Sequence, residues 1–119
     1  MTNLAASAPH IHNASMYDEL VDWGAQPDML AGASHSSGRL LHKGPNNQPE
    51  VGLWVCTPGT WRLAIPRDEF CHFVAGRALY RSDQGEEIEV SPGTIVLFPA
   101  GWAGVCTVWE TIRNLYMLA

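Results

Sequence analysis

The stretch GTIVLFPAGWAG, residues 93–104, decides the fold class of this chain. It opens with a glycine, continues as the apolar run 94–98 and ends in Pro99-Ala100-Gly101. A β-prone apolar run closed by proline and glycine is typical of a strand that enters a tight turn. Eight or nine such runs follow one another between residues 39 and 118. The pattern predicts an all-β sandwich or barrel, with the jelly roll among the candidates.

Turn-rich segments such as GPNNQP (44–49) and SDQG (82–85) separate the expected strands. These strands span residues 39–43, 51–56, 61–65, 69–74, 77–81, 86–90, 94–98, 103–109 and 112–118. A weak capping box at Ser15–Asp18, followed by apolar residues and Gly24, predicts a short helix. We therefore expect a tail, a short helix and a loop in residues 1–35, and one β-barrel domain in residues 36–119.

The composition limits the partners and the location. The net charge is −5 and only seven residues are Lys or Arg, which argues against binding of nucleic acid. No apolar run approaches the roughly 18–20 residues that span a bilayer. The N-terminus lacks the basic start and apolar core of a secretory signal, so we expect a cytoplasmic protein. Three cysteines without a C-x-x-C pair predict free, packed thiols.

Residues 93–104 resemble the second signature of the cupin family, G-x5-P-x-G-x2-H, at every fixed position but the last. The segment Glu69–Gly76 likewise matches the E-x6-G end of the first signature, G-x5-H-x-H-x(3,4)-E-x6-G. Over residues 50–119 the chain looks like a small single-domain cupin of the ureidoglycine-aminohydrolase-like or ethanolamine-utilisation-like branch. This resemblance implies an RmlC-like jelly roll, the double-stranded β-helix of cupins, with a short N-terminal helix added in this chain.

The resemblance also implies a metal site of three histidines and a glutamate, and here the chain departs from the pattern. Counting back seven and five residues from Glu69 places Arg62 and Ala64 at the first two histidine positions. Gly104 stands at the third, so only Glu69 remains of the usual ligands. The resemblance therefore predicts the fold, and predicts no cofactor of the usual kind.

Strand alternation predicts which side chains share the barrel interior with Glu69. Trp102 follows Pro99-Ala100-Gly101 in the turn of the second motif, where we expect it to form a ligand wall, a dimer contact or a cover over the end of the barrel. The predicted pocket residues are Arg62, Ala64, Glu69, Cys71, Trp102, Gly104 and Cys106. Two interpretations remain open. Arg62 and Glu69 form an internal ion pair beside packed thiols, or Glu69 binds a divalent metal together with Cys71, Cys106 or a histidine.

Three functions remain open at this point. In the first, the barrel binds a small organic molecule, such as an amine, a ureide or a carboxylate. Arg62 would hold an anionic group of this molecule, and Glu69 would act as a general acid or base if the protein is an enzyme. In the second, it is a metal-dependent enzyme of the ureidoglycine aminohydrolase type with a rearranged ligand set. In the third, it is a structural or interaction module. We expect a homodimer in each case. Strand alternation assigns Phe70 and His72 to the outer face of their strand, but the sequence alone does not settle whether His35, His42 or His72 faces the interior.

Overall fold

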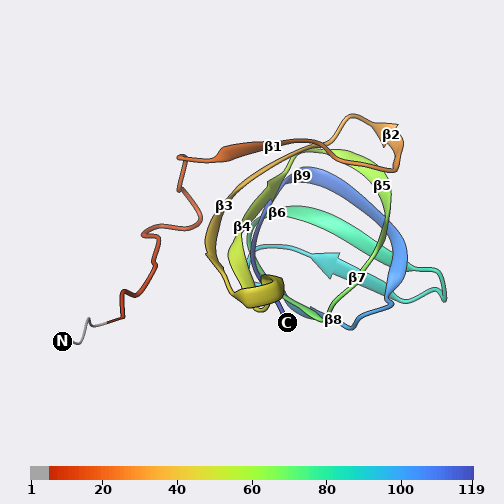
Figure 1. Cartoon of the computed structure of the whole chain (residues 1–119). Coiled ribbons are helices and arrows are strands. Elements are labelled where there is room, and N and C mark those ends of the chain that lie inside the picture. The colour runs from red at the N-terminus through yellow and green to blue at the C-terminus, as the bar shows by residue number, and fades with distance from the viewer. Residues whose placement is uncertain (1–5) are drawn as a thin grey trace, which may run out of the picture.

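The computed structural model describes residues 6–119, and all of its strands belong to one antiparallel sheet (Figure 1). One short 3-10 turn, η1 (Pro45–Asn47), lies between the third and fourth strands, and no helix in the described part of the chain could cross a membrane. The strands are β1 (Val21–Ala25), β2 (Met29–Gly32), β3 (His35–Lys43), β4 (Glu50–Cys56), β5 (Gly59–Ala64), β6 (Glu69–Ser82), β7 (Glu87–Val90), β8 (Ile95–Phe98) and β9 (Ala103–Leu118).

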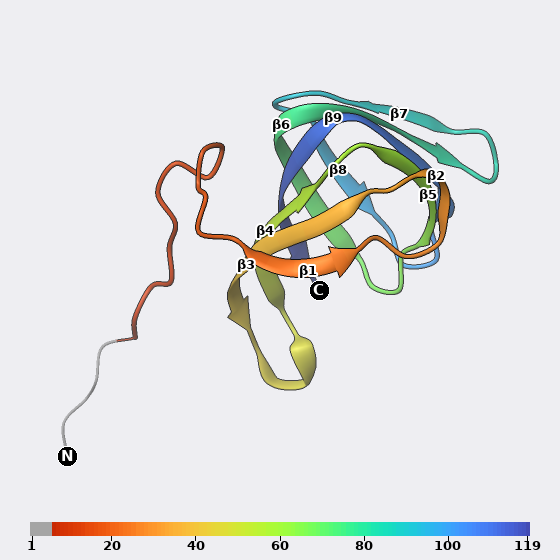
Figure 2. The same ribbon diagram turned by 90° about the horizontal axis from the view of Figure 1, so that it is seen from above.

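The two longest strands, β6 and β9, organise the sheet. They pair with each other along most of their lengths, and on its other side β9 pairs with β5 through its first half and with β4 through its second half. The sheet continues from β4 to β3 and β1, from β5 to β2, and from β6 to β7 and β8. It curls into a half-barrel, as Figures 1 and 2 show. The all-β, cupin-like fold predicted from the sequence is confirmed.

Gly76 marks a bend in β6, where the sequence predicts a break between two strands. The pairing of β6 with β9 shifts register on both sides of this residue, but the strand is continuous. Gly76 has a φ of +88°, and a Cβ here would lie 2.2 Å from the carbonyl oxygen of Thr111. Only glycine fits this conformation and this close approach. In the same way, the two strands expected at 103–109 and 112–118 form the single strand β9.

The predicted N-terminal helix is wrong. Residues 14–16 make a turn, and residues 21–25 form β1, which pairs with β3. Gly24, expected to cap a helix, has a φ of +91° and donates its amide hydrogen to Asp22 Oδ1 at 2.8 Å. A helix of two turns has little stability of its own, whereas pairing with β3 satisfies the backbone groups of β1. Strand β2 also lies in the segment expected to be loop and pairs with β5.

Aromatic residues fill the inside of the curl. Tyr80 of β6 lies at their centre, with ring centroids 5.0 Å from Phe98 and 6.0 Å from Phe73. The buried cluster comprises Cys56, Trp61, Ile65, Cys71, Phe73, Ala78, Tyr80, Val90, Phe98, Cys106, Val108 and Ile112. All three cysteines are buried free thiols, as their odd number predicts. One side of this core borders a cavity, which several of its residues line.

Candidate ligand-binding cavity

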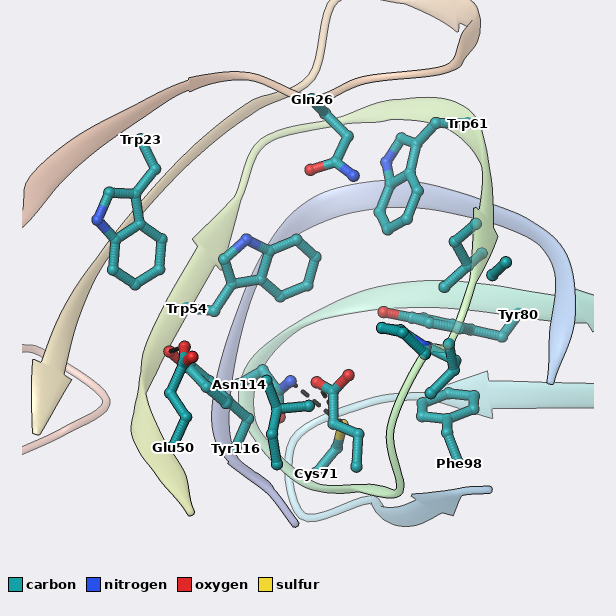
Figure 3. Close-up of a pocket in the computed structure, with 16 residues that line it drawn as sticks. Trp23, Gln26, Glu50, Trp54, Trp61, Cys71, Tyr80, Phe98, Asn114 and Tyr116 are labelled. Carbon is teal, nitrogen blue, oxygen red and sulfur yellow. Dashed lines mark hydrogen bonds between the residues drawn. The ribbon is translucent and has the colours of Figure 1, made fainter. Parts of the chain in front are cut away.

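A cavity of about 300 Å³ opens on the inner side of the curled sheet (Figure 3). Its aromatic lining residues are Trp23, Trp54, Trp61, Tyr80, Phe98 and Tyr116. Its polar lining residues are Gln26, Glu50, Glu69, Asn114 and the thiol Cys71. The remaining lining residues are Leu63, Ala64, Ile65, Pro66 and Leu118. Strands β1, β4, β5, β6, β8 and β9 each contribute, so the cavity forms only when the sheet has curled.

Glu69, the first residue of β6, brings a carboxyl group into this cavity. The thiol of Cys71, two residues further along the strand, donates a hydrogen bond to Glu69 Oε2 at 3.5 Å. Burial raises the pKa of Glu69, the hydrogen bond from Cys71 opposes this rise, and the negative charge of Glu50 adds to it. The carboxyl group is therefore suited to hold a proton at a pH where an exposed glutamate has lost it.

Asn114 of β9 completes the polar floor next to Glu69. Its Nδ2 donates a hydrogen bond to Cys71 Sγ at 3.3 Å, which fixes the orientation of the amide group. Its Oδ1 is buried and has no hydrogen-bond partner among the described residues. Burying a carbonyl oxygen without a hydrogen-bond donor costs free energy, because the oxygen loses its hydrogen bonds to water. A hydrogen bond from a bound molecule would recover this loss.

Glu50, the first residue of β4, forms a second acidic group at the edge of the cavity. It accepts a hydrogen bond from the Tyr116 hydroxyl, with 2.9 Å between the two oxygens. On its outer side, Glu50 Oε1 lies 3.9 Å from Lys43 Nζ. Burial, followed by the hydrogen bond to Glu50, raises the pKa of Tyr116, so the phenol stays protonated and keeps donating at neutral pH.

The opposite wall is built from two indole rings, of which Trp54 makes a hydrogen bond and Trp61, among the described residues, has no partner for its buried Nε1. Trp54 Nε1 donates to Ser36 Oγ at 3.2 Å, and Ser36 Oγ donates to Gln26 Oε1 at 2.7 Å. The rings of Trp54 and Trp61 meet edge to face, with centroids 6.0 Å apart. In Figure 3, Gln26, Trp61, Tyr80, Asn114 and Trp54 surround a common space.

The predicted ion pair between Arg62 and Glu69 is wrong. The Arg62 side chain is exposed, and its Nη2 donates to both carboxylate oxygens of Asp83, at 3.1 and 2.8 Å. Trp61 and Leu63, the neighbours of Arg62 in β5, face the core instead. Arg62 therefore lies on the outer face of the strand and leaves Glu69 without this partner.

Arg62 was placed inside the barrel because we counted four residues, and not three, between the second histidine position of the first signature and Glu69. Counting five and seven residues back from Glu69 reaches the outer face of β5, although Ala64 still borders the cavity. The shorter spacing, which the signature also allows, gives Ile65 and Leu63, and both line the cavity. The two positions that correspond to the family's paired histidines thus carry aliphatic side chains.

Three other predicted residues lie away from the cavity. Gly104 and Cys106 are buried on the inner face of β9 but do not line it. A Cβ at Gly104 would lie 2.1 Å from the Arg81 carbonyl oxygen, so a histidine does not fit there. Trp102 packs on Phe98, with ring centroids 5.0 Å apart, and covers the core. Of the seven predicted pocket residues, Glu69, Cys71 and Ala64 line the cavity.

The residues of this site do not fit a metal ion. Leu63, Ile65 and Gly104 offer no donor atoms, and burial raises the pKa of the Cys71 thiol, which disfavours the thiolate that binds metals. Within residues 6–119, no three His, Cys, Asp or Glu side chains lie close enough together to hold an ion. The rearranged ligand set considered from the sequence is therefore not assembled by these residues.

The histidines lie outside the cavity. His35 Nε2 lies 2.5 Å from Asp22 Oδ1 at the surface, where this contact lowers the pKa of Asp22. His42 is exposed near the end of β3. His72 lies on the outer face of β6, in a groove that it shares with Phe70 and Met117. Strand alternation predicts this placement of His72.

Thirteen of the sixteen lining residues are not among those predicted from the sequence, including Trp23, Gln26, Glu50, Asn114 and Tyr116. For two of them a signal was present. Asn114 and Tyr116 share the alternation that begins at Gly104 in β9, so extending that pattern along the strand places them on the inner face. The position of Glu50 at the cavity depends on the pairing of Glu50 with Leu118, and only the folded sheet reveals this pairing.

The family model of the EutQ-like cupin domain matches residues 43–116 of the sequence. The chain belongs to this family. A search of curated protein sequences found no significant match. The match confirms the expected branch of small cupins, and it includes the strands that carry Glu50, Glu69 and Asn114.

Solved structures share the fold of this EutQ-like cupin at low sequence identity. A DUF861 family protein from Pseudomonas syringae pv. tomato aligns with a TM-score of 0.77 and 17% identity over 86% of this chain, which spans only 45% of that protein. The Clostridium difficile EutQ protein aligns with a TM-score of 0.61 and 17% identity, over 71% of this chain and 68% of its own. A cupin-like protein from Thermotoga maritima aligns with a TM-score of 0.63 and 15% identity, over 82% of this chain and 76% of its own.

Proposed function

We propose that this cupin binds a small organic molecule in the cavity beside Glu69. The cavity of about 300 Å³ supports this proposal, because its volume and its mainly apolar, aromatic lining with a few polar groups resemble known ligand sites. A barrel that served only as an interaction module would fill this space with side chains. Glu69 and the unpartnered Oδ1 of Asn114 would anchor the ligand.

The test is to fill the cavity. Leu63→Trp places a large ring among the lining residues, whereas Leu97→Trp adds the same ring at an exposed position of β8. We expect a screen of small organic molecules, read by amide chemical shifts in NMR spectra, to find ligands that perturb Cys71 and Asn114. These ligands should bind the Leu97→Trp variant and not the Leu63→Trp variant. Equal binding to both variants would contradict the proposal.

Proton transfer by Glu69 is a second candidate function. Its raised pKa supports a role as general acid or base toward the bound molecule. The hydrogen bond from Cys71 and the contact of Cys71 with Asn114 would hold the carboxyl group in one orientation. Turnover of an identified ligand that Glu69→Gln abolishes, with its binding retained, would distinguish this function from binding alone.

We propose that the outer face of the sheet pairs with a second copy of the chain. Phe70 lies opposite Leu97 and Met117 in the neighbouring strands, and His72 lies opposite Ile95 and Leu115. Phe70, Leu97, Ile95 and Met117 expose 41%, 64%, 64% and 45% of their surfaces. These rows carry no Lys, Arg, Asp or Glu, so two identical faces would meet without charge repulsion. Ile95→Glu with Leu97→Glu should convert a dimer to a monomer in light scattering, and an unchanged mass would contradict it.

We also propose a cytoplasmic location. Three buried free thiols support a reducing compartment. The net charge of −5 gives no support for a nucleic-acid partner.

A further inference from the structure

The charged groups of the cavity are of one sign. Its sixteen described lining residues include Glu50 and Glu69 but no Lys, Arg or His. Lys43 approaches Glu50 from outside the cavity, and Arg62 is held by Asp83. None of the ion pairs within residues 6–119 involves Glu69. Burying a carboxylate without a counter-ion costs free energy. A ligand with a positive charge would supply the counter-ion that the cavity lacks.

The walls of the same cavity carry the surfaces that attract organic cations. Trp23, Trp54 and Trp61 line it together with Tyr80 and Tyr116. Indole and phenol rings present negative faces to a cation, and the attraction strengthens where water is excluded. Trp54 and Trp61 stand edge to face, so their ring planes differ by 87° and they can contact two sides of one rounded group.

The polar floor adds hydrogen-bond acceptors. Asn114 is 2% exposed, and its Oδ1 has no donor among the described residues. The hydrogen bond from Nδ2 to Cys71 Sγ orients the amide, and Oδ1 stays without a donor. An ammonium group that carries hydrogen could donate to Glu69 and to Asn114, while its alkyl part contacts the indole rings.

We propose that the cavity binds a small organic cation, which carries an alkylammonium or quaternary ammonium group. The indole rings of Trp54 and Trp61 would contact this cation on one side, and the carboxylates of Glu69 and Glu50 would face it on the other. This inference rests on the proposed ligand-binding function and assigns the chemical class of the ligand. Positive charge is the property that the cavity selects, because its carboxylates and ring faces attract cations and repel anions.

The test compares probes of similar shape and different charge. Tetramethylammonium and n-propylammonium are the cations, tert-butyl alcohol is the neutral probe and pivalate is the anion, each titrated at pH 8 by calorimetry and by tryptophan fluorescence. We expect at least one cation to bind about tenfold or more tightly than the neutral and anionic probes. Glu69→Gln should lower the affinity for that cation about tenfold and leave the affinity for tert-butyl alcohol unchanged.

Trp54→Leu provides a second variant, and Trp109→Phe is its control because Trp109 lies on the outer surface beside Arg77. Near-ultraviolet circular dichroism establishes that each variant is folded. If Trp54→Leu weakens cation binding and Trp109→Phe does not, the inference is supported. Tighter binding of tert-butyl alcohol or pivalate than of either cation would overturn the inference and keep the proposed ligand-binding function. If none of the four probes binds, the inference fails, whereas the proposed ligand-binding function is decided separately by the screen of the Leu63→Trp and Leu97→Trp variants.

Discussion

Cys71 and Glu69 lie two residues apart on β6 and face the same cavity, with the thiol sulfur 3.5 Å from Glu69 Oε2. The sulfur also accepts a hydrogen bond from Asn114, so the three side chains form one chain of contacts across β6 and β9. The thiol acts here as a donor that orients the carboxyl group. The family's glutamate position, Glu69, is thus held by a thiol and an amide, while the positions of the family's histidines carry Leu63, Ile65 and Gly104.

The first prediction concerns the pH dependence of folding stability. Burial is the main cause that raises the pKa of Glu69 above its ordinary value of 4.5. Below pH 4.5 the carboxyl group is protonated in both the folded and the unfolded state. As pH rises, the unfolded state loses its proton first, so the free energy of unfolding falls until Glu69 is also ionised in the folded state. Glu69→Gln should remove this fall.

Urea unfolding at pH 4, 6 and 8 measures this effect in the wild type and in Glu69→Gln. Glu89→Gln, a change at an exposed residue of β7, is the matched control and should follow the wild type. We expect the stability of Glu69→Gln relative to the wild type to increase from pH 4 to pH 8. Parallel curves for the wild type and Glu69→Gln would show that burial of this carboxyl group does not affect folding.

The second prediction concerns binding of a cation. The carboxyl group of Glu69 compensates a positive charge when it is ionised and not when it is protonated. The affinity for tetramethylammonium should therefore rise with pH as Glu69 loses its proton. The other titratable groups of the cavity are Glu50, Cys71, Tyr80 and Tyr116. Burial raises the pKa values of Cys71, Tyr80 and Tyr116, so these groups stay neutral throughout the range.

For a single proton the rise in affinity is at most about tenfold per pH unit. Calorimetric titrations between pH 4.5 and pH 8 measure it, and Glu69→Gln should flatten the profile. A variant with Glu50→Gln separates the contribution of the second carboxylate. An affinity in the wild type that does not depend on pH would argue against a role of Glu69 in holding the charge.

Turns and strand alternation could be predicted from the sequence because both are local properties. The turn after Phe98 forms as predicted, with the Trp102 amide donating to the Pro99 carbonyl at 3.0 Å. The alternation of β6 correctly places Cys71 inside and Phe70 outside. A pattern of side chains within one strand depends only on the backbone geometry of that strand.

The site could be predicted only in part, because it depends on long-range pairings. Glu50 and Asn114 reach the cavity through the pairing of β4 with β9, which joins residues more than fifty positions apart. Arg62 was misplaced because one additional residue between the signature positions and Glu69 moves every side chain of β5 to the opposite face. The predicted helix failed because Trp23 and its neighbours gain more from pairing with β3 than from an isolated helical turn.

The third prediction tests why Gly104 cannot be a histidine. A Cβ at this position would lie 2.1 Å from the carbonyl oxygen of Arg81, and both atoms belong to paired strands that cannot separate freely. Gly104→Ala should therefore lower the free energy of unfolding by about 2 kcal/mol, measured by urea unfolding. Gly85→Ala is the control, because a Cβ there meets no atom within 4 Å and the cost of about 1 kcal/mol comes from its positive φ alone. A Gly104→Ala variant as stable as the wild type would show that the two strands adjust.

The last prediction tests the register of β5 by adding imidazoles. Leu63 and Ile65 line the cavity with Glu69, so Leu63→His with Ile65→His should bring two imidazoles toward one carboxylate and create a site for Ni²⁺. Nickel at about a hundred times its dissociation constant should stabilise this variant by about 2.7 kcal/mol, a rise of roughly 10 °C in melting temperature. Arg62→His with Ala64→His is the control pair and should show little change, because Arg62 faces outward. Adding Glu69→Gln to the cavity pair should abolish most of the rise, since it removes the third ligand. A larger response from the control pair would mean that β5 presents its other face to the cavity, and the assignment of Leu63 and Ile65 to the vacant ligand positions would then be wrong.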